Sequence, residues 1–391
     1  MPTSSNPERP TDDTNKLRGK AISFYLPQFH PIAENDRWWQ PGFTDWNNVV
    51  VTKPRYKGHY QPHLPGALGF YDLRLEQTRI DQAAMAEQHG IHGFCYYHYW
   101  FAGKRLLEQP FDEVRRSGVP DFPFCLCWAN QTWSRTWSGR GQDVLVAQEY
   151  SDADNDAHIE WLIEAFGDPR YIRVDGKPLF LIYLPEGIPD LSALLDRWKT
   201  RVHERLGLEP HFCAVRTGFS TISNEGLIAH GFDAIVDFQP NRNTFPKAIN
   251  ATGKGISLLR RLLPESWYDA MRDSLLLGSR DINTRVDYRA LAEAALQQVS
   301  DSQCITYPSV FPSWDNSARR TAATIIQNNS ADDYLRWLIG ALDRVSSYPE
   351  ENRLVFLNAW NEWAEGCHLE PDQQNEFVFL EATRKALMSQ N

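Results

Sequence analysis

The sequence lacks the short motifs that identify several large classes of enzyme. It contains no GxGxxG, no GxSxG, no HExxH and no GxxxxGK followed by Ser or Thr. These absences argue against a dinucleotide fold, a serine-hydrolase elbow, a zincin helix and a P-loop. The sequence also lacks any run of 18 apolar residues, and residues 1–20 have no apolar core of the kind found in signal peptides. We therefore expect no integral membrane segment and a cytoplasmic location.

Cysteine is scarce, and basic residues are outnumbered by acidic ones. The six Cys in 391 residues form no C-x-x-C pair and no Cys/His cluster at zinc spacing. Most of them lie within apolar runs, so we expect small buried side chains in a reducing compartment. The 50 acidic and 40 basic residues give a net charge of −10. Because this charge repels phosphate backbones and anionic lipids, we expect no nucleic-acid partner.

Eight short apolar runs alternate with longer amphipathic stretches along the chain. The runs lie at 21–26, 93–97, 124–128, 179–183, 211–215, 234–238, 304–307 and 354–358. Helical spacing of apolar residues occurs at 75–89, 158–166, 191–206, 288–299, 333–345 and 374–388. Nearly continuous apolar runs are typical of buried parallel strands. The alternation predicts a single (β/α)8 TIM barrel over residues 18–391, preceded by a disordered tail at 1–17.

The longest stretch between two predicted strands is 239–302, an insertion between strands six and seven. It carries two leucine-rich segments, 256–263 and 267–277. A connection of this length is a candidate lid over a site. The spacing of its Leu residues favours the alternative, an extra pair of helices packed on the side of the barrel.

Two carboxylates follow the eighth predicted strand. Glu362 and Glu365 are three residues apart, so a helix or tight turn would hold their Cβ atoms about 5–6 Å from each other. Two carboxyls at that separation suit acid/base catalysis at a glycosidic bond. Such a pair is often a solvated helix face, but the flanking Trp360 and Trp363 at a strand end favour a catalytic pair.

A metal site is the competing interpretation of this segment. Glu365 and His368 have the Glu-x-x-His spacing of di-iron sites in helical bundles. Such sites need a second copy of the spacing, and no other Glu in the chain has His three residues later. We therefore expect no metal and no cofactor, and we expect His368 to contact or support the substrate.

Side chains that suit sugars follow most of the predicted strands. Active sites of these barrels are built from the segments after the strands, and sugars present C–H faces together with a rim of hydroxyls. Of the fourteen Trp, ten lie near strand ends, at 38, 39, 46, 100, 128, 133, 137, 314, 360 and 363. The predicted substrate-binding residues are Tyr25, Gln28, His30, Trp39, His63, Tyr97, His98, Trp100, Trp128, Asn130, Gln131, Trp133, Trp314, Asp315, Asn358, Trp360, Asn361 and His368. The expected partner is an oligosaccharide or polysaccharide, and the sequence identifies no protein partner.

An Asp-Ala-Asp-Asn-Asp sequence occupies residues 152–156. It contains the DxD pattern with which many nucleotide-sugar transferases hold a divalent ion. It also directly precedes a predicted helix, where Asp and Asn cap the N-terminus, and we favour capping.

Several of these segments together resemble the WbsX-like group of glycoside hydrolase family 99-like proteins. The matching stretches are 25–30, 38–39, 42–44, 57–62, 69–74, 93–100, 123–130, 314–316 and 358–371. The resemblance implies a (β/α)8 barrel with its active site at the C-terminal ends of the strands. In family 99, endo-acting α-mannosidases carry an Asn-Glu-Trp-x-Glu-Gly motif, which residues 361–366 match.

The resemblance also implies roles for the two carboxylates. Glu362 would take the proton of the sugar 2-OH, so that O2 attacks the anomeric carbon and forms a 1,2-anhydro sugar. Glu365 would protonate the leaving oxygen and later activate water, with net retention. The chain departs from the family at Gln131, where Glu is usual. Three hypotheses follow: a retaining glycoside hydrolase acting on an α-linked glycan such as a bacterial surface polysaccharide or its intermediate, a glycosyltransferase of polysaccharide biosynthesis using the same site, and an inactive glycan-binding protein.

Overall fold

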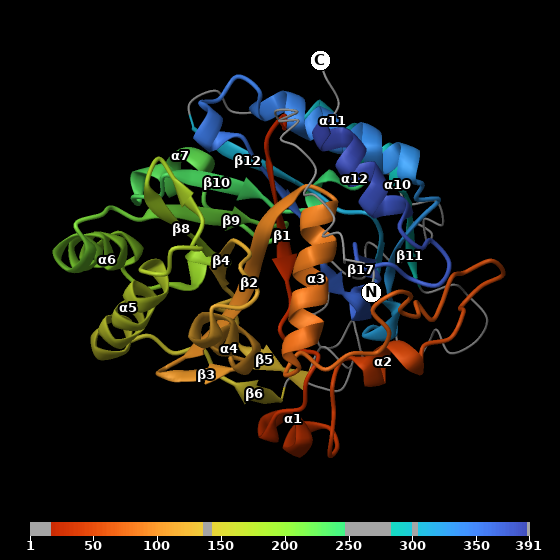
Figure 1. Ribbon diagram of the computed structural model, residues 1–391, viewed down its shortest axis with the longest axis horizontal. Helices are drawn as coiled ribbons and strands as arrows, with labels where there is room; N and C mark the ends of the chain where they lie inside the picture. Colours follow the sequence, from red (N-terminus) through yellow and green to blue (C-terminus); the bar gives the residue numbers. More distant parts are fainter. Residues whose placement is uncertain (1–16, 136–142, 247–282, 299–303, 389–391) are drawn as a thin grey trace, which may run out of the picture.

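A closed barrel of eight parallel strands forms the centre of the protein. The computed structural model describes residues 17–135, 143–246, 283–298 and 304–388. The strands follow the order β1-β15-β12-β10-β9-β8-β4-β2, and β2 pairs with β1 to close the barrel (Figure 1). They are β1 (Lys20–Tyr25), β2 (Ile91–Phe101), β4 (Phe124–Trp128), β8 (Lys177–Ile182), β9 (His211–Arg216), β10 (Ala234–Asp237), β12 (Thr306–Val310) and β15 (Leu354–Leu357). Each corresponds to one predicted run, and the (β/α)8 barrel is confirmed.

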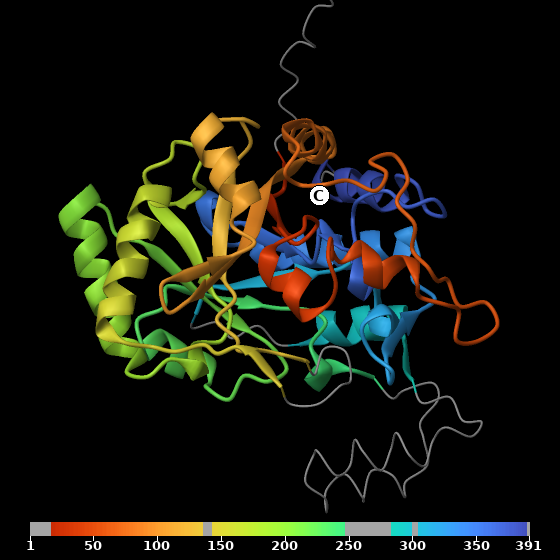
Figure 2. The ribbon, with the colours of Figure 1, turned by 90° about the horizontal axis from the view of Figure 1, so that it is seen from below.

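Helices connect the strands and cover the outside of the barrel (Figure 2). They are α3 (Glu76–Gln88), α4 (Gln109–Ser117), α5 (Asp152–Phe166), α6 (Leu191–Leu206), α7 (Asn224–Ala229), α10 (Tyr288–Gln297), α11 (Ala331–Val345) and α12 (Val378–Met388). The sequence analysis did not predict α4 and α7, because nine and six residues are too few for a clear helical period. It also placed the start of α5 six residues late.

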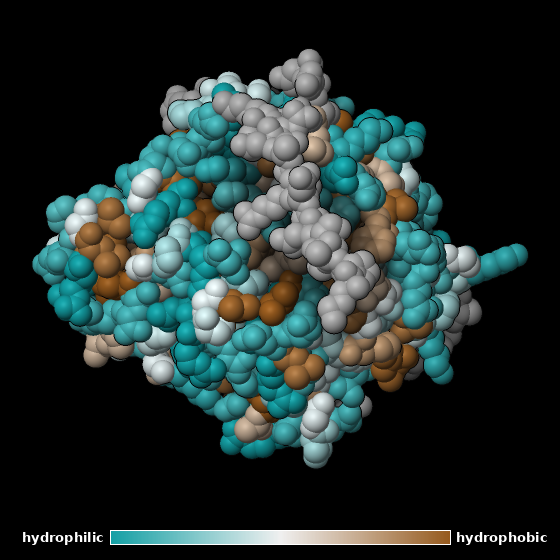
Figure 3. All heavy atoms as spheres, viewed as in Figure 1, coloured by the Kyte–Doolittle hydropathy of each residue, from teal (hydrophilic) through white to brown (hydrophobic). Residues whose placement is uncertain are grey.

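The barrel strands are apolar because they are buried along almost their whole length. All five residues of β4 are buried, as are five of the six in β8. Five of the six cysteines are buried, Cys304 is half-buried, and all six are free thiols. The face seen in Figure 3 is mostly hydrophilic, with apolar residues in small separate patches. No helix in the described ranges combines the length and the apolar character needed to cross a bilayer.

Most of the short elements lie in segments that follow the barrel strands, whereas β7 and η5 directly precede β8 and β15. Figure 1 shows several of them gathered below the ends of β1 and β2. The helices are α1 (Ala33–Trp38), α2 (Trp46–Val50), η2 (Pro185–Gly187), η3 (Arg242–Thr244), η4 (Asn316–Ala318), η5 (Glu350–Asn352) and η6 (Trp363–Glu365). The strands are β3 (Lys104–Leu106), β5 (Trp133–Ser134), β6 (Val144–Val146), β7 (Arg173–Val174), β11 (Thr284–Asp287), β13 (Trp314–Asp315), β14 (Thr324–Gln327), β16 (Asn361–Glu362) and β17 (Cys367–His368).

Part of the predicted insertion at 239–302 belongs to the described structure. Strand β11 leads into α10 and pairs with β14, which in turn pairs with β13 in a three-stranded sheet. The leucine-rich segments 256–263 and 267–277 lie outside the described residues, so the choice between a lid and a helical pair stays a prediction.

Candidate active site

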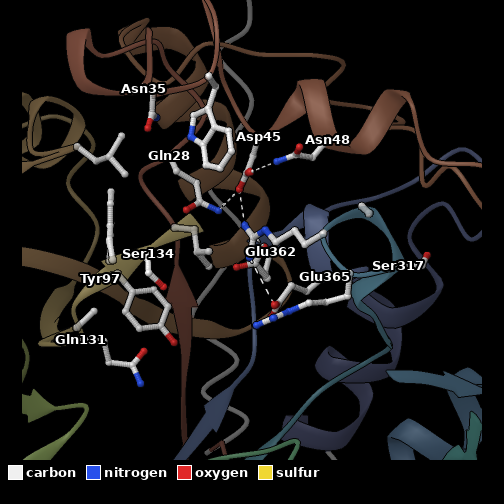
Figure 4. Close-up of a pocket in the computed structure, with 18 of the residues that line it drawn as sticks. Gln28, Asn35, Asp45, Asn48, Tyr97, Gln131, Ser134, Ser317, Glu362 and Glu365 are labelled. Carbon is white, nitrogen blue, oxygen red and sulfur yellow. Dashed lines mark hydrogen bonds and ion pairs between the residues drawn. The ribbon is translucent and has the colours of Figure 1, made fainter. Parts of the chain in front are cut away.

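A cavity of about 1030 Å³ lies where the barrel strands end, within the size range of small-molecule and glycan pockets. Figure 4 shows Asp45, Glu362 and Glu365 on one side of it and Tyr97 and Gln131 on the other. The predicted site residues that line the cavity are Gln28, Trp39, Tyr97, Gln131, Trp133, Trp314, Asn358, Glu362 and Glu365. They come from segments far apart in the sequence, which the barrel brings to one end.

The two glutamates are carried by a tight hairpin after the eighth strand. Glu362 ends β16, Glu365 ends the 3-10 turn η6, and β17 returns antiparallel to β16. Gly366 follows the turn with φ 55°, and a Cβ on it would lie 3.1 Å from the Cβ of Asp315. A glycine is therefore required there for both its backbone conformation and the close approach. The structure has the tight turn that the sequence analysis considered for this pair.

Asn361 ties the hairpin to the first barrel strand. Its Oδ1 accepts the backbone N–H of Leu26 at 2.8 Å, and its Nδ2 donates to the carbonyl of Leu26 at 3.0 Å. The side chain is fully buried. A pair of bonds to the backbone of one residue fixes the direction of β16, and therefore the position from which Glu362 enters the cavity.

Glu370 holds the hairpin from behind. Its carboxylate accepts the Tyr71 hydroxyl at 2.7 Å, the Gln82 amide at 2.6 Å and the Trp363 indole N–H at 2.7 Å. Trp363 is the first residue of the turn that carries Glu365. This buried carboxylate therefore joins the turn to the segment before α3 and to α3 itself.

We expect Glu370→Gln to lower the free energy of unfolding by about 1–3 kcal/mol, because an amide cannot accept from all three donors and leaves at least one of them unpaired. Urea denaturation measures the change. Glu209→Gln, at an exposed pair with His203, is the matched control and should leave stability nearly unchanged. Equal stability of the two variants would contradict the structural role of Glu370.

One arginine lies between the two glutamates. Arg319 Nη2 is 3.0 Å from Glu362 Oε1, and Arg319 Nη1 is 3.5 Å from Glu365 Oε1. The same guanidinium donates to Asp45, which also accepts from Gln28 and, at 3.1 Å, from Asn48. The side chains of Arg319 and Asp45 are each 10 % exposed, and that of Glu362 is 9 % exposed. The Arg319 guanidinium thus faces three carboxylates, of which Asp45 and Glu362 are buried and Glu365 is 15 % exposed.

Burial and charge shift the proton affinities of this cluster. Burial raises the pKa of Glu362 well above its usual value; Arg319 opposes the shift, and Glu365 and Asp45 add to it. Burial likewise raises the pKa of Glu365, against the effect of Arg319 and Arg320. Burial lowers the pKa of Arg319, but the three carboxylates outweigh it and raise that pKa above its usual value. The cluster therefore favours a protonated glutamate beside a charged arginine.

The loop that carries Arg319 is itself held in place. Arg55 donates to the carbonyls of Ser317 and Thr321, each at 2.6 Å, and to Asn283 Oδ1 at 2.7 Å. These bonds fix the backbone on both sides of Arg319, so the guanidinium enters the cavity from an ordered loop.

Asp315 holds the beginning of the loop that carries Arg319. It accepts from His59 at 2.6 Å and from Gln61 at 2.7 Å, and it caps the backbone N–H of Ser317 at 2.9 Å. The stretch at 57–62 is therefore a support for the Arg319 loop rather than part of the cavity lining.

Aromatic rings line another part of the cavity. Trp38 and Trp133 meet edge to face at 6.0 Å, and Trp39 stacks on Phe43 at 5.6 Å. All four side chains line the cavity. Flat apolar rings near hydrogen-bonding side chains suit the C–H faces of sugars.

Several predicted substrate contacts are buried outside the cavity lining. These are Tyr25, His30, His63, His98, Trp100, Trp128, Asn130, Asp315, Trp360, Asn361 and His368. Side chains alternate along a strand, so Tyr97 faces the cavity while the next residue turns away. His98 bonds to His158 of α5 at 3.0 Å, and the Trp100 indole donates to Asp154 at 2.9 Å. Direct sugar contact by these residues stays a prediction, which their burial outside the cavity lining does not favour.

The remaining members of that set are structural in the same way. Asn130 holds both backbone polar groups of Leu184 at 2.8 Å, as Asn361 does for Leu26. Tyr25 donates to Gln82 at 2.7 Å. Trp360 is fully buried and packs against Phe94 with ring centroids 5.2 Å apart.

The acidic sequence at 152–156 forms the first turn of α5. Ser151 caps the helix by accepting the N–H of Asp154, so the predicted capping is made by the preceding serine and not by an Asp. Asp152 pairs with Arg197 at 2.6 Å. Neither Asp152 nor Asp154 lines the cavity.

The sequence analysis missed the groups that surround the glutamates. Asp45, Asn48, Arg55, Arg319 and Arg320 all line the cavity. Asn48 lies in α2 and the others lie on loops, away from the strand ends on which the analysis concentrated. Arg319 could have been considered from the sequence, because it lies three residues after the stretch at 314–316 that carries part of the family resemblance.

Comparisons with known proteins place this barrel in a family. The sequence profile of a family described as "Glycosyltransferase WbsX" matches residues 21–383. The chain belongs to the WbsX family. Two curated relatives from Xanthomonas campestris pv. campestris, each named "Uncharacterized protein WxcX", are 40 % identical over 373 residues. That match covers 95 % of this chain and 50 % of each relative, so the chain spans about half the length of the curated relatives it matches.

Solved structures share the WbsX barrel at low sequence identity. A structure titled "Glycoside hydrolase-like protein" has a TM-score of 0.56 and 14 % identity, covering 98 % of this chain and 97 % of that one. A GH99 endo-alpha-mannosidase from Bacteroides thetaiotaomicron has a TM-score of 0.52 and 14 % identity, covering 94 % and 96 %. These likenesses agree on the fold. The printed description of the WbsX family is that of a glycosyltransferase, a class of glycan-processing enzyme.

Proposed function

We propose that this protein is a retaining glycoside hydrolase that acts on an α-linked glycan, with Glu362 as base and Glu365 as acid. The observation that carries the proposal is a pair of glutamates, three residues apart, on a tight hairpin in a cavity lined by aromatic rings. Burial raises the pKa of both glutamates, which supports a proton donor in this pair. Arg319 lies closer to Glu362, at 3.0 Å, than to Glu365, at 3.5 Å, which supports Glu362 as the ionised member and Glu365 as the donor.

In the first proposed step, Glu362 takes the proton of the sugar 2-OH. O2 then forms a bond to the anomeric carbon while the bond from that carbon to the leaving oxygen breaks, and Glu365 gives its proton to the leaving oxygen. In the second step, Glu365 takes a proton from water. The water oxygen bonds to the anomeric carbon, the C1–O2 bond breaks, and O2 recovers its proton from Glu362. Two inversions give net retention.

The first substrates to test are α-mannosides, because the similar solved barrels include GH99 endo-alpha-mannosidases. Purified protein incubated with α-linked manno-oligosaccharides and bacterial surface polysaccharides should release sugar, and NMR of the first product should show the retained α-anomer. Release of the β-anomer first would contradict the proposed mechanism.

The rate should depend on pH through the raised pKa values of both glutamates. Activity needs Glu362 ionised and Glu365 protonated, so kcat should rise with pH through the first pKa and fall through the second. Both limbs should lie above the range of an ordinary glutamate, since burial raises both pKa values. A pH–rate profile from pH 4 to 9 measures this. A profile that is flat above pH 5 would contradict it.

A second candidate function is glycosyl transfer, which the printed description of the WbsX family supports. The same carboxylates would act on a nucleotide-linked or lipid-linked donor. In that case calorimetry would detect binding of a nucleotide-sugar, and the product analysis would find the sugar on an acceptor rather than on water. Asp152 and Asp154 lie outside the cavity lining, so the donor would be held by other groups.

A further inference from the structure

Three ligand-type side chains meet behind the hairpin that carries the glutamates. Each of His63, His368 and Asp372 offers one atom, and these atoms all lie within 4.8 Å of one another. His63 Nδ1 is 2.9 Å from His368 Nε2, which is 3.8 Å from Asp372 Oδ2. All three are buried, and none lines the cavity. This cluster is the single group of this kind within the part of the chain that the structure describes.

Two hydrogen-bond acceptors, each with a lone pair to donate to a metal ion, converge in the cluster. His368 Nδ1 lies 2.9 Å from the carbonyl oxygen of Glu370, so that nitrogen carries the proton and Nε2 presents a lone pair. Nε2 faces Asp372 Oδ2, a second acceptor, across 3.8 Å. His63 Nδ1 can supply one proton between them. An imidazole whose far N–H is held by a backbone carbonyl is the usual outer arrangement of a metal-binding histidine.

The cluster is rigidly held. The Trp363 ring stacks on His368 at 3.7 Å and 15°, and the Tyr60 ring stacks on His63 at 4.4 Å and 24°. Asp372 Oδ1 accepts the backbone N–H of Gln374 at 2.9 Å, and Asp372 Oδ2 accepts the Asn375 amide at 2.9 Å. The carboxylate is therefore oriented by its own loop and by the side chain of Tyr60, with Oδ2 toward His368.

We propose that His63, His368 and Asp372 bind one divalent transition-metal ion. Two imidazoles and one carboxylate form a donor set that suits Zn²⁺. With Zn–N bonds of about 2.0–2.1 Å, tetrahedral binding needs the two nitrogens about 0.4 Å further apart than they are here. The ion takes the place of the proton that lies between the imidazoles, so binding releases that proton. The sequence analysis expected no metal, because it considered Glu365 together with His368 and not His63.

The ion would act as a structural link between the two supports of the catalytic hairpin. His63 directly follows the stretch at 57–62 that holds Asp315, and His368 pairs with Asn361 in the β16–β17 hairpin. Joining them fixes the Arg319 loop relative to Glu362. This proposal does not depend on which reaction the glutamates perform.

The first test is metal content of the full chain, purified with any histidine tag removed and dialysed against metal-free buffer. Elemental analysis should find about one zinc per chain in the wild type and a loss of at least tenfold in His368→Gln and Asp372→Asn. His98→Gln is the matched control: it alters a second buried pair, His98 and His158 at 3.0 Å, that has no carboxylate partner. It should keep its zinc. Less than one-tenth equivalent in the wild type would overturn the proposal.

The second test uses the wild type alone and so covers the case in which the variants do not fold. Removing the ion with a chelator should lower the melting temperature, and micromolar Zn²⁺ should restore it. Co²⁺ added to the apoprotein should give the visible absorption bands of a tetrahedral site. A melting temperature unchanged by zinc, together with no cobalt bands, would overturn the proposal.

Discussion

Glu362→Gln and Glu365→Gln should each lower kcat on a glycan substrate by about 10²–10⁴-fold, the usual contribution of one acid or base group. Each change keeps the shape of the side chain but removes its ability to exchange a proton. Both glutamates line the cavity and contact Arg319. Because the shape of each side chain is kept, both variants should fold. Because the proton exchange is removed, both should lose the reaction.

The measurement is the initial rate of sugar release, with the melting temperature as a check on folding. Glu209→Gln, at an exposed pair far from the cavity lining, is the matched control and should retain the wild-type rate. If either cavity variant released sugar as fast as the wild type, the assignment of its role would fail.

Arg319→Met should destabilise the protein by about 3–5 kcal/mol at neutral pH, because it leaves Asp45, Glu362 and Glu365 buried without their cation. Removing the cation raises the pKa values of Glu362 and Glu365 further in the folded state. Stability from such groups is present at low pH and is lost as pH rises through the folded pKa. The destabilisation should therefore be smaller at pH 5 than at pH 8.

Urea denaturation at both pH values measures this effect, together with the pH–rate profile of the variant. The acid limb of that profile should move to higher pH, since Glu362 ionises less readily without Arg319. Arg197→Met breaks a pair with Asp152 at the start of α5 and is the control. A pair this exposed should change little in either measurement. An Arg319→Met variant as stable at pH 8 as at pH 5, with an unmoved acid limb, would contradict the role given to Arg319.

The barrel could be predicted from the sequence because buried parallel strands are apolar along their whole length. The run at 124–128, for example, is fully buried as β4. Because the strands are apolar throughout, the sequence did not indicate which of their side chains face the cavity. A run such as 93–100 has no alternation of polar and apolar residues, so the sequence did not tell that Tyr97 faces the cavity and that His98 and Trp100 face α5.

The candidate pair could be predicted, but its surroundings could not. Glu362 and Glu365 lie directly after a strand in a recognisable motif, whereas Asp45 and Arg319 lie on loops 274 residues apart. Only the folded chain brings them together. For Asn361 the sequence and the structure point to different roles. Its place in the motif suggested contact with sugar, whereas in the structure its side chain makes two hydrogen bonds to the backbone of Leu26.

The leaving-group dependence of Glu365→Gln tests the central claim most directly. A glycosyl fluoride needs little protonation on departure, whereas the oxygen of a glycan leaving group needs an acid. The account predicts that Glu365→Gln keeps kcat/KM for an α-glycosyl fluoride within about tenfold of the wild type, because kcat/KM reports the first step, and loses about 10²–10⁴-fold in kcat/KM on the glycan. Equal rates for variant and wild type on the glycan would contradict it.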